Sequence, residues 1–72
     1  MTFLEQVADG LALEVLKAVD ETGNEDIIEE VKKTVGASST TLEEAYMTAI
    51  RVRRSEQRGL AALEAVMRKI NG

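Results

Sequence analysis

The chain contains no proline, and its apolar residues recur every three or four positions instead of alternating. Proline is the residue that interrupts helices most strongly, and a three-to-four spacing lines apolar side chains along one face of a helix. Aromatic residues, which favour strands, are limited to Phe3 and Tyr46. These features predict an all-α fold.

Two polar segments, ETGN at 21–24 and ASSTT at 37–41, divide the chain into three expected helices. They span about 2–20, 24–35 and 41–70. A polar stretch at 51–59 leaves the continuity of the third open, but we favour one helix, whose length of about 45 Å matches the other two together. A long C-terminal helix packed against two shorter ones forms a small three-helix bundle or an extended helical hairpin, as a single helical domain over 1–72, and is expected to bury all three apolar stripes.

Helix ends are predicted from residues that cap free backbone groups. Asn24 or Thr22 is expected to cap the second helix, and Thr22 with Glu25 matches a capping box. Gly36 is expected to end that helix in the left-handed conformation. A capping box is also expected at the start of the third helix, from Thr40 with Glu43 or from Thr41 with Glu44.

One broad face of the first helix is apolar and is expected to meet the core. It comprises Leu4, Val7, Ala8, Leu11, Val15, Ala18 and Val19. Leu13 and Leu16 fall on the opposite side, where they are either ordinary surface leucines or part of a partner surface. Gly10 in the middle of this helix either permits a close helix crossing or is merely tolerated, at about 1 kcal/mol relative to alanine.

A heptad pattern with a moderate coiled-coil character runs along the third helix. Seven of its nine core positions are apolar; the nine are Leu42, Ala45, Ala49, Val52, Glu56, Gly59, Leu63, Val66 and Ile70. Arg53 and Glu56 also lie on this stripe, three residues apart, and are expected to pair. Either they fix register or partner choice, or the seam opens to water there.

Known catalytic and metal-binding patterns are missing. The chain has neither cysteine nor histidine, which excludes disulfides, Cys–His and Ser–His–Asp sets and the commonest metal ligands. The acidic stretch DETGNED (20–26) fails as a calcium loop because its sixth position is not glycine and its twelfth is not glutamate. We therefore expect no enzyme activity, no catalytic residue, no cofactor, no metal and no small-molecule substrate.

Charge is unevenly distributed. Nine acidic and three basic residues give residues 1–36 a charge of −6, whereas four acidic and six basic residues give 37–72 a charge of +2. Such asymmetry favours association with a second copy or a charged partner. The first residues carry acids rather than a basic signal region, and no apolar run approaches the ~20 residues that span a bilayer. We expect a cytoplasmic protein without membrane contact.

The sequence thus favours a non-catalytic helical protein–protein interaction module, either a homo-oligomer or a small adaptor or regulator. A core this small usually needs support from association. The expected interface residues are Leu13, Leu16, Arg53, Glu56, Leu63, Val66 and Ile70.

The alternative is a small nucleic-acid-associated regulator. Arg51, Arg54 and Arg58 fall on the helix face opposite the apolar stripe, where they either contact phosphates or form an ordinary solvated surface. The joint near Gly36 could make the third helix the reading helix of a helix-turn-helix. No aromatic residues interleave for base stacking, and the acidic first half opposes approach to nucleic acid.

Overall fold

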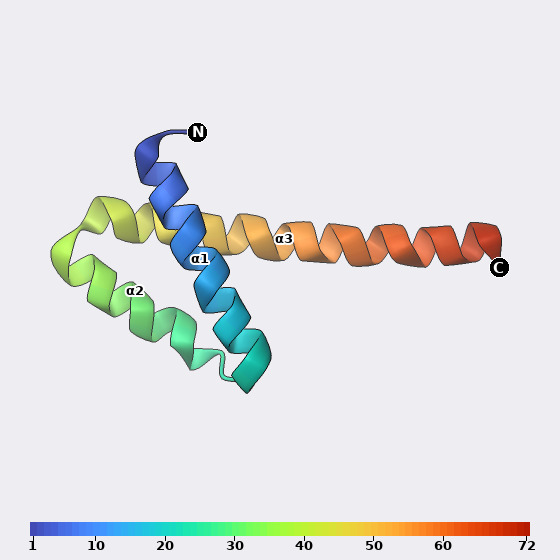
Figure 1. The fold of residues 1–72 in the computed structure, drawn as a ribbon, viewed down its shortest axis with the longest axis horizontal. Helices are drawn as coiled ribbons and strands as arrows, with labels where there is room; N and C mark the ends of the chain where they lie inside the picture. Colours follow the sequence, from blue (N-terminus) through green and yellow to red (C-terminus); the bar gives the residue numbers. More distant parts are fainter.

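The computed structural model describes all 72 residues and contains three helices joined by short turns (Figure 1). They are α1 (Phe3–Thr22), α2 (Asp26–Ser38) and α3 (Thr40–Asn71). The all-α prediction is confirmed, as is the long third helix packed against two shorter ones. α3 continues unbroken through 51–59, since a single Gly59 without proline does not stop a helix.

The two short helices pack only against the first half of α3, and its second half projects alone (Figure 1). The radius of gyration is 14.8 Å, whereas a compact chain of this length has one of about 11 Å. The expectation that all three apolar stripes are buried is therefore wrong. α1 and α2 do not line up end to end along α3, because the chain doubles back at Gly23 and brings them against each other.

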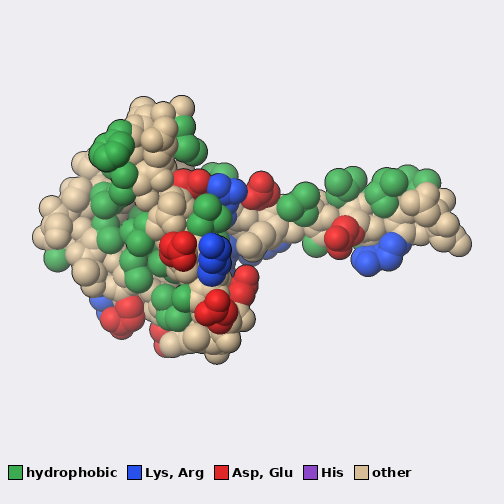
Figure 2. All heavy atoms as spheres, viewed as in Figure 1, with side chains coloured by type: hydrophobic (Ala, Val, Ile, Leu, Met, Phe, Trp, Pro, Cys, Tyr) green, Lys and Arg blue, Asp and Glu red, His purple; other side chains and the backbone are tan.

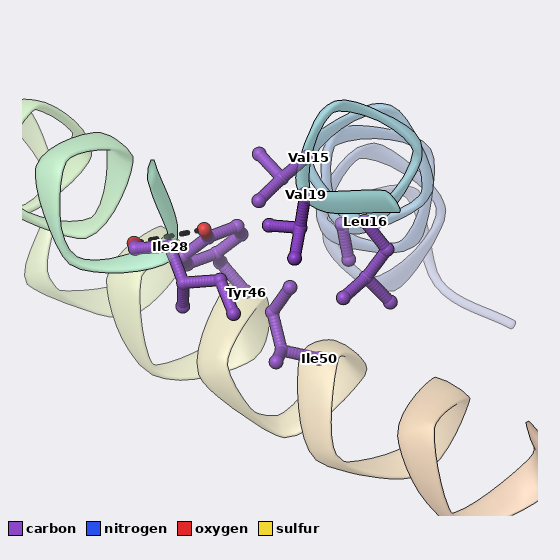
Figure 3. Close-up of a cluster of buried hydrophobic side chains, with 7 residues drawn as sticks. Val15, Leu16, Val19, Ile28, Tyr46 and Ile50 are labelled. Carbon is purple, nitrogen blue, oxygen red and sulfur yellow. Dashed lines mark hydrogen bonds between the residues drawn. The ribbon is translucent and has the colours of Figure 1, made fainter. Parts of the chain in front are cut away.

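The core lies where the three helices meet, and its buried side chains come from all of them (Figure 3). They are Ala12, Val15, Leu16, Val19, Ile28, Tyr46 and Ile50.

The buried face of α1 is rotated from the one predicted. Leu16 is only 5% exposed, so its expected place on a partner surface is wrong, while Leu4 and Val7 stay 36% and 40% exposed. The fully buried Ala8 and Ala12 explain the rotation, because small side chains let α1 approach α3 closely, and Leu16 shares their face.

Tyr46 is the largest fully buried side chain and links two helices. Its hydroxyl donates a hydrogen bond of 3.0 Å to the carbonyl oxygen of Ile28, so that α3 is tied to α2 (Figure 3). Burial, followed by the nearby charge of Glu29, raises the pKa of Tyr46 above its ordinary value. No buried side-chain nitrogen or oxygen lacks a hydrogen-bond partner.

The first turn of the chain differs from the expected one. Gly23 takes the left-handed conformation, with φ of 71°, and ends α1. The N-cap of α2 is Glu25, which makes no side-chain capping hydrogen bond; Asn24, one of the two predicted caps, stands one residue earlier and accepts a hydrogen bond of 3.0 Å from the backbone N–H of Asp26. The predicted capping box of Thr22 with Glu25 is absent. A capping box that was not predicted begins α1, where Thr2 pairs with Glu5 and the hydrogen bonds lower the pKa of Glu5.

The second turn is shorter than predicted. α2 continues through Gly36, whose predicted left-handed role is wrong; the carboxylate of Glu43 lies in the space that a side chain there would occupy. Ser39 alone separates α2 from α3 and caps α3 by accepting from Leu42 N–H at 3.0 Å. The predicted Thr40 and Thr41 caps are therefore wrong, since both lie inside the helix.

Candidate interaction surface

The most unusual surface belongs to the projecting end of α3, residues 57–71, here called the arm. Every side chain of the arm is exposed. Five large apolar side chains lie at three- and four-residue intervals along it and are 44–69% exposed; this arm stripe is Leu60, Leu63, Val66, Met67 and Ile70. Figure 2 shows apolar side chains along one edge of the arm and charged ones along the other. Nothing in the chain covers the stripe.

A groove between α1 and α3 adjoins the arm on the same face of α3. It has a volume of about 270 Å³, and α3 lines it with Thr48 and with three apolar residues, Ala45, Ala49 and Val52. These three residues hold the same heptad positions as Leu63, Val66 and Ile70 in the arm, so groove and arm stripe form one line along the helix. We call this line, from Ala45 to Ile70, the seam.

The core uses a different face of α3, which is why the seam stays open. Tyr46 and Ile50 point into the core, and Ala49, beside them on the seam, is packed partly against it. Ala45 and Ala49 are only partly buried, and Val52 is exposed. A helix has room for both contacts because core and seam occupy adjacent sectors of its circumference.

An ion-pair cluster stands at the middle of the seam. Arg53 pairs with Glu56 at 3.1 Å, which confirms the predicted local pair. Arg53 also binds Asp9 of α1 with two hydrogen bonds, of 2.8 Å from Nε and 2.7 Å from one terminal nitrogen. The guanidinium therefore meets a polar group of its own chain, one that no sequence pattern indicated because Asp9 is distant in sequence.

Electrostatics within this cluster favour the charged forms. The hydrogen bonds from Arg53 hold the pKa of Asp9 below its ordinary value, and those to Asp9 and Glu56 raise the pKa of Arg53. The two-pronged contact fixes α1 to α3 just before the arm begins. A role of Arg53 and Glu56 in partner choice stays a prediction.

The three arginines of the alternative site share one side of α3. Arg51, Arg54 and Arg58 line a shallow depression beside Ile28. Arg54, expected on a solvated face, instead binds both carboxylate oxygens of Glu25, at 2.6 and 2.8 Å. The start of α2 reaches this face because α2 folds back along α3, and it neutralises the central arginine of the set.

The predicted interface residues thus separate into groups. Leu63, Val66 and Ile70 lie together on the arm, and Arg53 and Glu56 lie at its base. Leu13 is 37% exposed on α1, apart from Leu16 in the core. Leu60 and Met67 complete the arm stripe but were missing from the predicted interface; their helical spacing with Leu63 was the available signal.

The chain shows neither a metal site nor a membrane-spanning helix. No three Asp, Glu, His or Cys side chains gather closely enough to hold a metal ion. None of the helices is long and apolar enough to cross a membrane. No protein-family model, curated protein or solved structure matches the chain.

Proposed function

We propose that this chain is a non-catalytic helical protein-interaction module that binds its partner through the arm. The observation that carries the proposal is the arm stripe: five large apolar side chains exposed on a helix that nothing in the chain covers. Contiguous exposed apolar surface of this kind marks protein interaction sites. Helical spacing of the five residues suits docking against another helix or into a helical groove.

Energetic considerations support a partner for the arm. Full burial of one such side chain contributes about 1.5–3 kcal/mol, so even partial burial of five outweighs a modest loss of conformational freedom. A helix of about 15 residues without tertiary contacts is only marginally stable in water. Docking of the stripe would both bury it and hold the arm helical. The absence of cysteine suits a reducing compartment, so we place the interaction in the cytoplasm.

The test is an affinity capture from extract of the source cells, with three forms of the tagged chain compared. Leu63→Glu with Ile70→Glu places charge in the stripe, while Lys17→Glu makes an equal change of net charge at an exposed position on α1 and is the matched control. We expect a protein, or a second copy of the chain, to be retained by the wild type and the control but lost from the double variant. Equal retention by all three forms would contradict the proposal.

A second candidate is a nucleic-acid-associated regulator, favoured by the common depression that Arg51, Arg54 and Arg58 line. Two observations weigh against it: Arg54 is already paired with the carboxylate of Glu25, and the chain has a net charge of −4. Titration of duplex DNA decides the matter. Affinity should fall with salt as counterions are released, and should fall further in Arg51→Glu with Arg58→Glu but not in Lys17→Glu. Absence of binding at low salt would eliminate this function.

A further inference from the structure

We infer that the partner of the arm is a second copy of this chain, bound with the two α3 helices antiparallel. Each arm then lies along the groove half of the other copy's seam. The inference rests on the proposed function and names its partner. Three independent features of the seam support it: the sizes of its side chains, the position of Gly59, and the charges on either side of its middle.

Side-chain size changes along the seam in a complementary way. The groove half carries Ala45, Ala49 and Val52, whereas the arm half carries Leu63, Val66 and Ile70. Antiparallel helices pair one heptad core position with the other, which sets Val52 against Leu63, Ala49 against Val66 and Ala45 against Ile70 of the second copy. Every small residue thus meets a larger one. A parallel pair would instead set Ala49 against Ala49 and leave a void.

The polar middle of the seam fits the same register. In the antiparallel pair Glu56 faces Gly59 of the second copy, the one seam position without a side chain. Space therefore remains for the Glu56 carboxylate, which Arg53 holds at 3.1 Å. In a parallel pair the two Glu56 carboxylates would face each other across the seam, and like charges in that position repel. The register that suits the apolar residues also avoids this repulsion.

Net charge points in the same direction. The arm has three basic residues and one acidic residue, a charge of +2, whereas residues 1–56 have six basic and twelve acidic residues, a charge of −6. Glu5 and Asp9 line the groove. The antiparallel arrangement places each positive arm on the negative part of the other copy, while a parallel arrangement would bring like parts together.

The experiment uses pairs of single-cysteine variants, since the natural chain has no cysteine to form background disulfides. Val52→Cys and Leu63→Cys are both made at exposed positions, so folding is preserved. Mixed and oxidised, they should form a covalent heterodimer, while each alone should cross-link weakly. Ala65→Cys, on the arm but off the seam, is the control and should not cross-link with Val52→Cys. Sedimentation equilibrium of the unmodified chain should give a dimer that Leu63→Glu dissociates.

The outcomes separate this inference from the function on which it rests. Efficient cross-linking of Val52→Cys with itself would overturn the antiparallel register. A monomer at every concentration, with no cross-link in the mixture, would overturn the homodimer. If the affinity capture still retained another protein in a stripe-dependent way, the interaction function would stand with a different partner. If that retention were absent as well, both proposals would fail.

Discussion

At the scale of single residues, Tyr46 is the largest fully buried side chain. Its ring is fully buried among the three helices, and its hydroxyl spans from α3 to the carbonyl oxygen of Ile28. Tyr46→Phe keeps the ring and removes only this hydrogen bond, so we expect the free energy of unfolding to fall by about 1 kcal/mol. Chemical denaturation followed by circular dichroism measures the change. Phe3→Leu, at an exposed aromatic, is the control and should lie within about 0.5 kcal/mol of the wild type. An unchanged midpoint for Tyr46→Phe would contradict the role of the hydroxyl.

The contact of Asp9 with Arg53 predicts a dependence of stability on pH. Because the pKa of Asp9 is lowered in the folded chain, its contribution is fully present above the ordinary value of 3.8. The contribution is lost as pH falls through the lowered value. We therefore expect Asp9→Asn to be less stable than the wild type at neutral pH, with a difference that shrinks in acid. Denaturation midpoints measured across the acid range test this. Glu14→Gln, which breaks an exposed pair with Lys17, is the control. A difference that stays constant into acid would exclude the ion pair as its cause.

These residues also show what the sequence could predict of the site. Arg53 and Glu56 are three positions apart on a helix, so helix geometry alone predicted their pairing. Asp9 and Tyr46 act through contacts between helices, and such contacts depend on how the helices cross. Leu16 was misplaced for the same reason, since the face of α1 that enters the core was set by the close approach of Ala8 and Ala12.

At the scale of elements, two glycines of the α1 region should respond in opposite ways to alanine. A side chain at Gly10 meets nothing within 4 Å, so this glycine is merely tolerated and Gly10→Ala should raise the free energy of unfolding by about 0.5–1 kcal/mol. Gly23 has a φ of 71°, in the left-handed region that alanine disfavours. Gly23→Ala should therefore lower the free energy of unfolding by about 1–2 kcal/mol. Thermal and chemical denaturation measure both changes, and each variant serves as the control for the other. Effects of the same sign would contradict the assigned conformations.

Helix number and continuity followed from the absence of proline and the spacing of apolar residues, but the turns followed less closely. Several residues near each turn could cap equally well on paper. Ser39, and not Thr40 or Thr41, caps α3 because the short joint leaves only Ser39 outside the helices. Gly36 stayed helical because Gly23 and Ser39 make the turns, and its small size instead makes room for Glu43.

At the scale of the whole molecule, the chain divides into a packed part and the arm. The heptad pattern predicted where the apolar stripe of α3 lies, but not that half of it stays uncovered. That outcome depends on where α1 and α2 cross α3, because both pack against its first half and reach none of its second half (Figure 1). The exposure of the arm therefore results from how the three helices of one chain pack together. The stability of the arm can be measured separately from that of the packed part.

Hydrogen exchange provides the decisive measurement on the arm. In dilute solution, arm amides should exchange quickly, because a helix this short lacks stabilising contacts, while amides near Val15 and Ile50 should be the slowest. Raising the protein concentration should slow exchange in the arm selectively, since the second copy that we propose would then cover the stripe. Leu63→Glu should keep arm exchange fast at every concentration, and Lys17→Glu, at an exposed position on α1, should behave as the wild type does. Arm amides as protected as the core in a dilute monomer would mean that the arm is stable by itself, and the energetic case for a docked partner would then be lost.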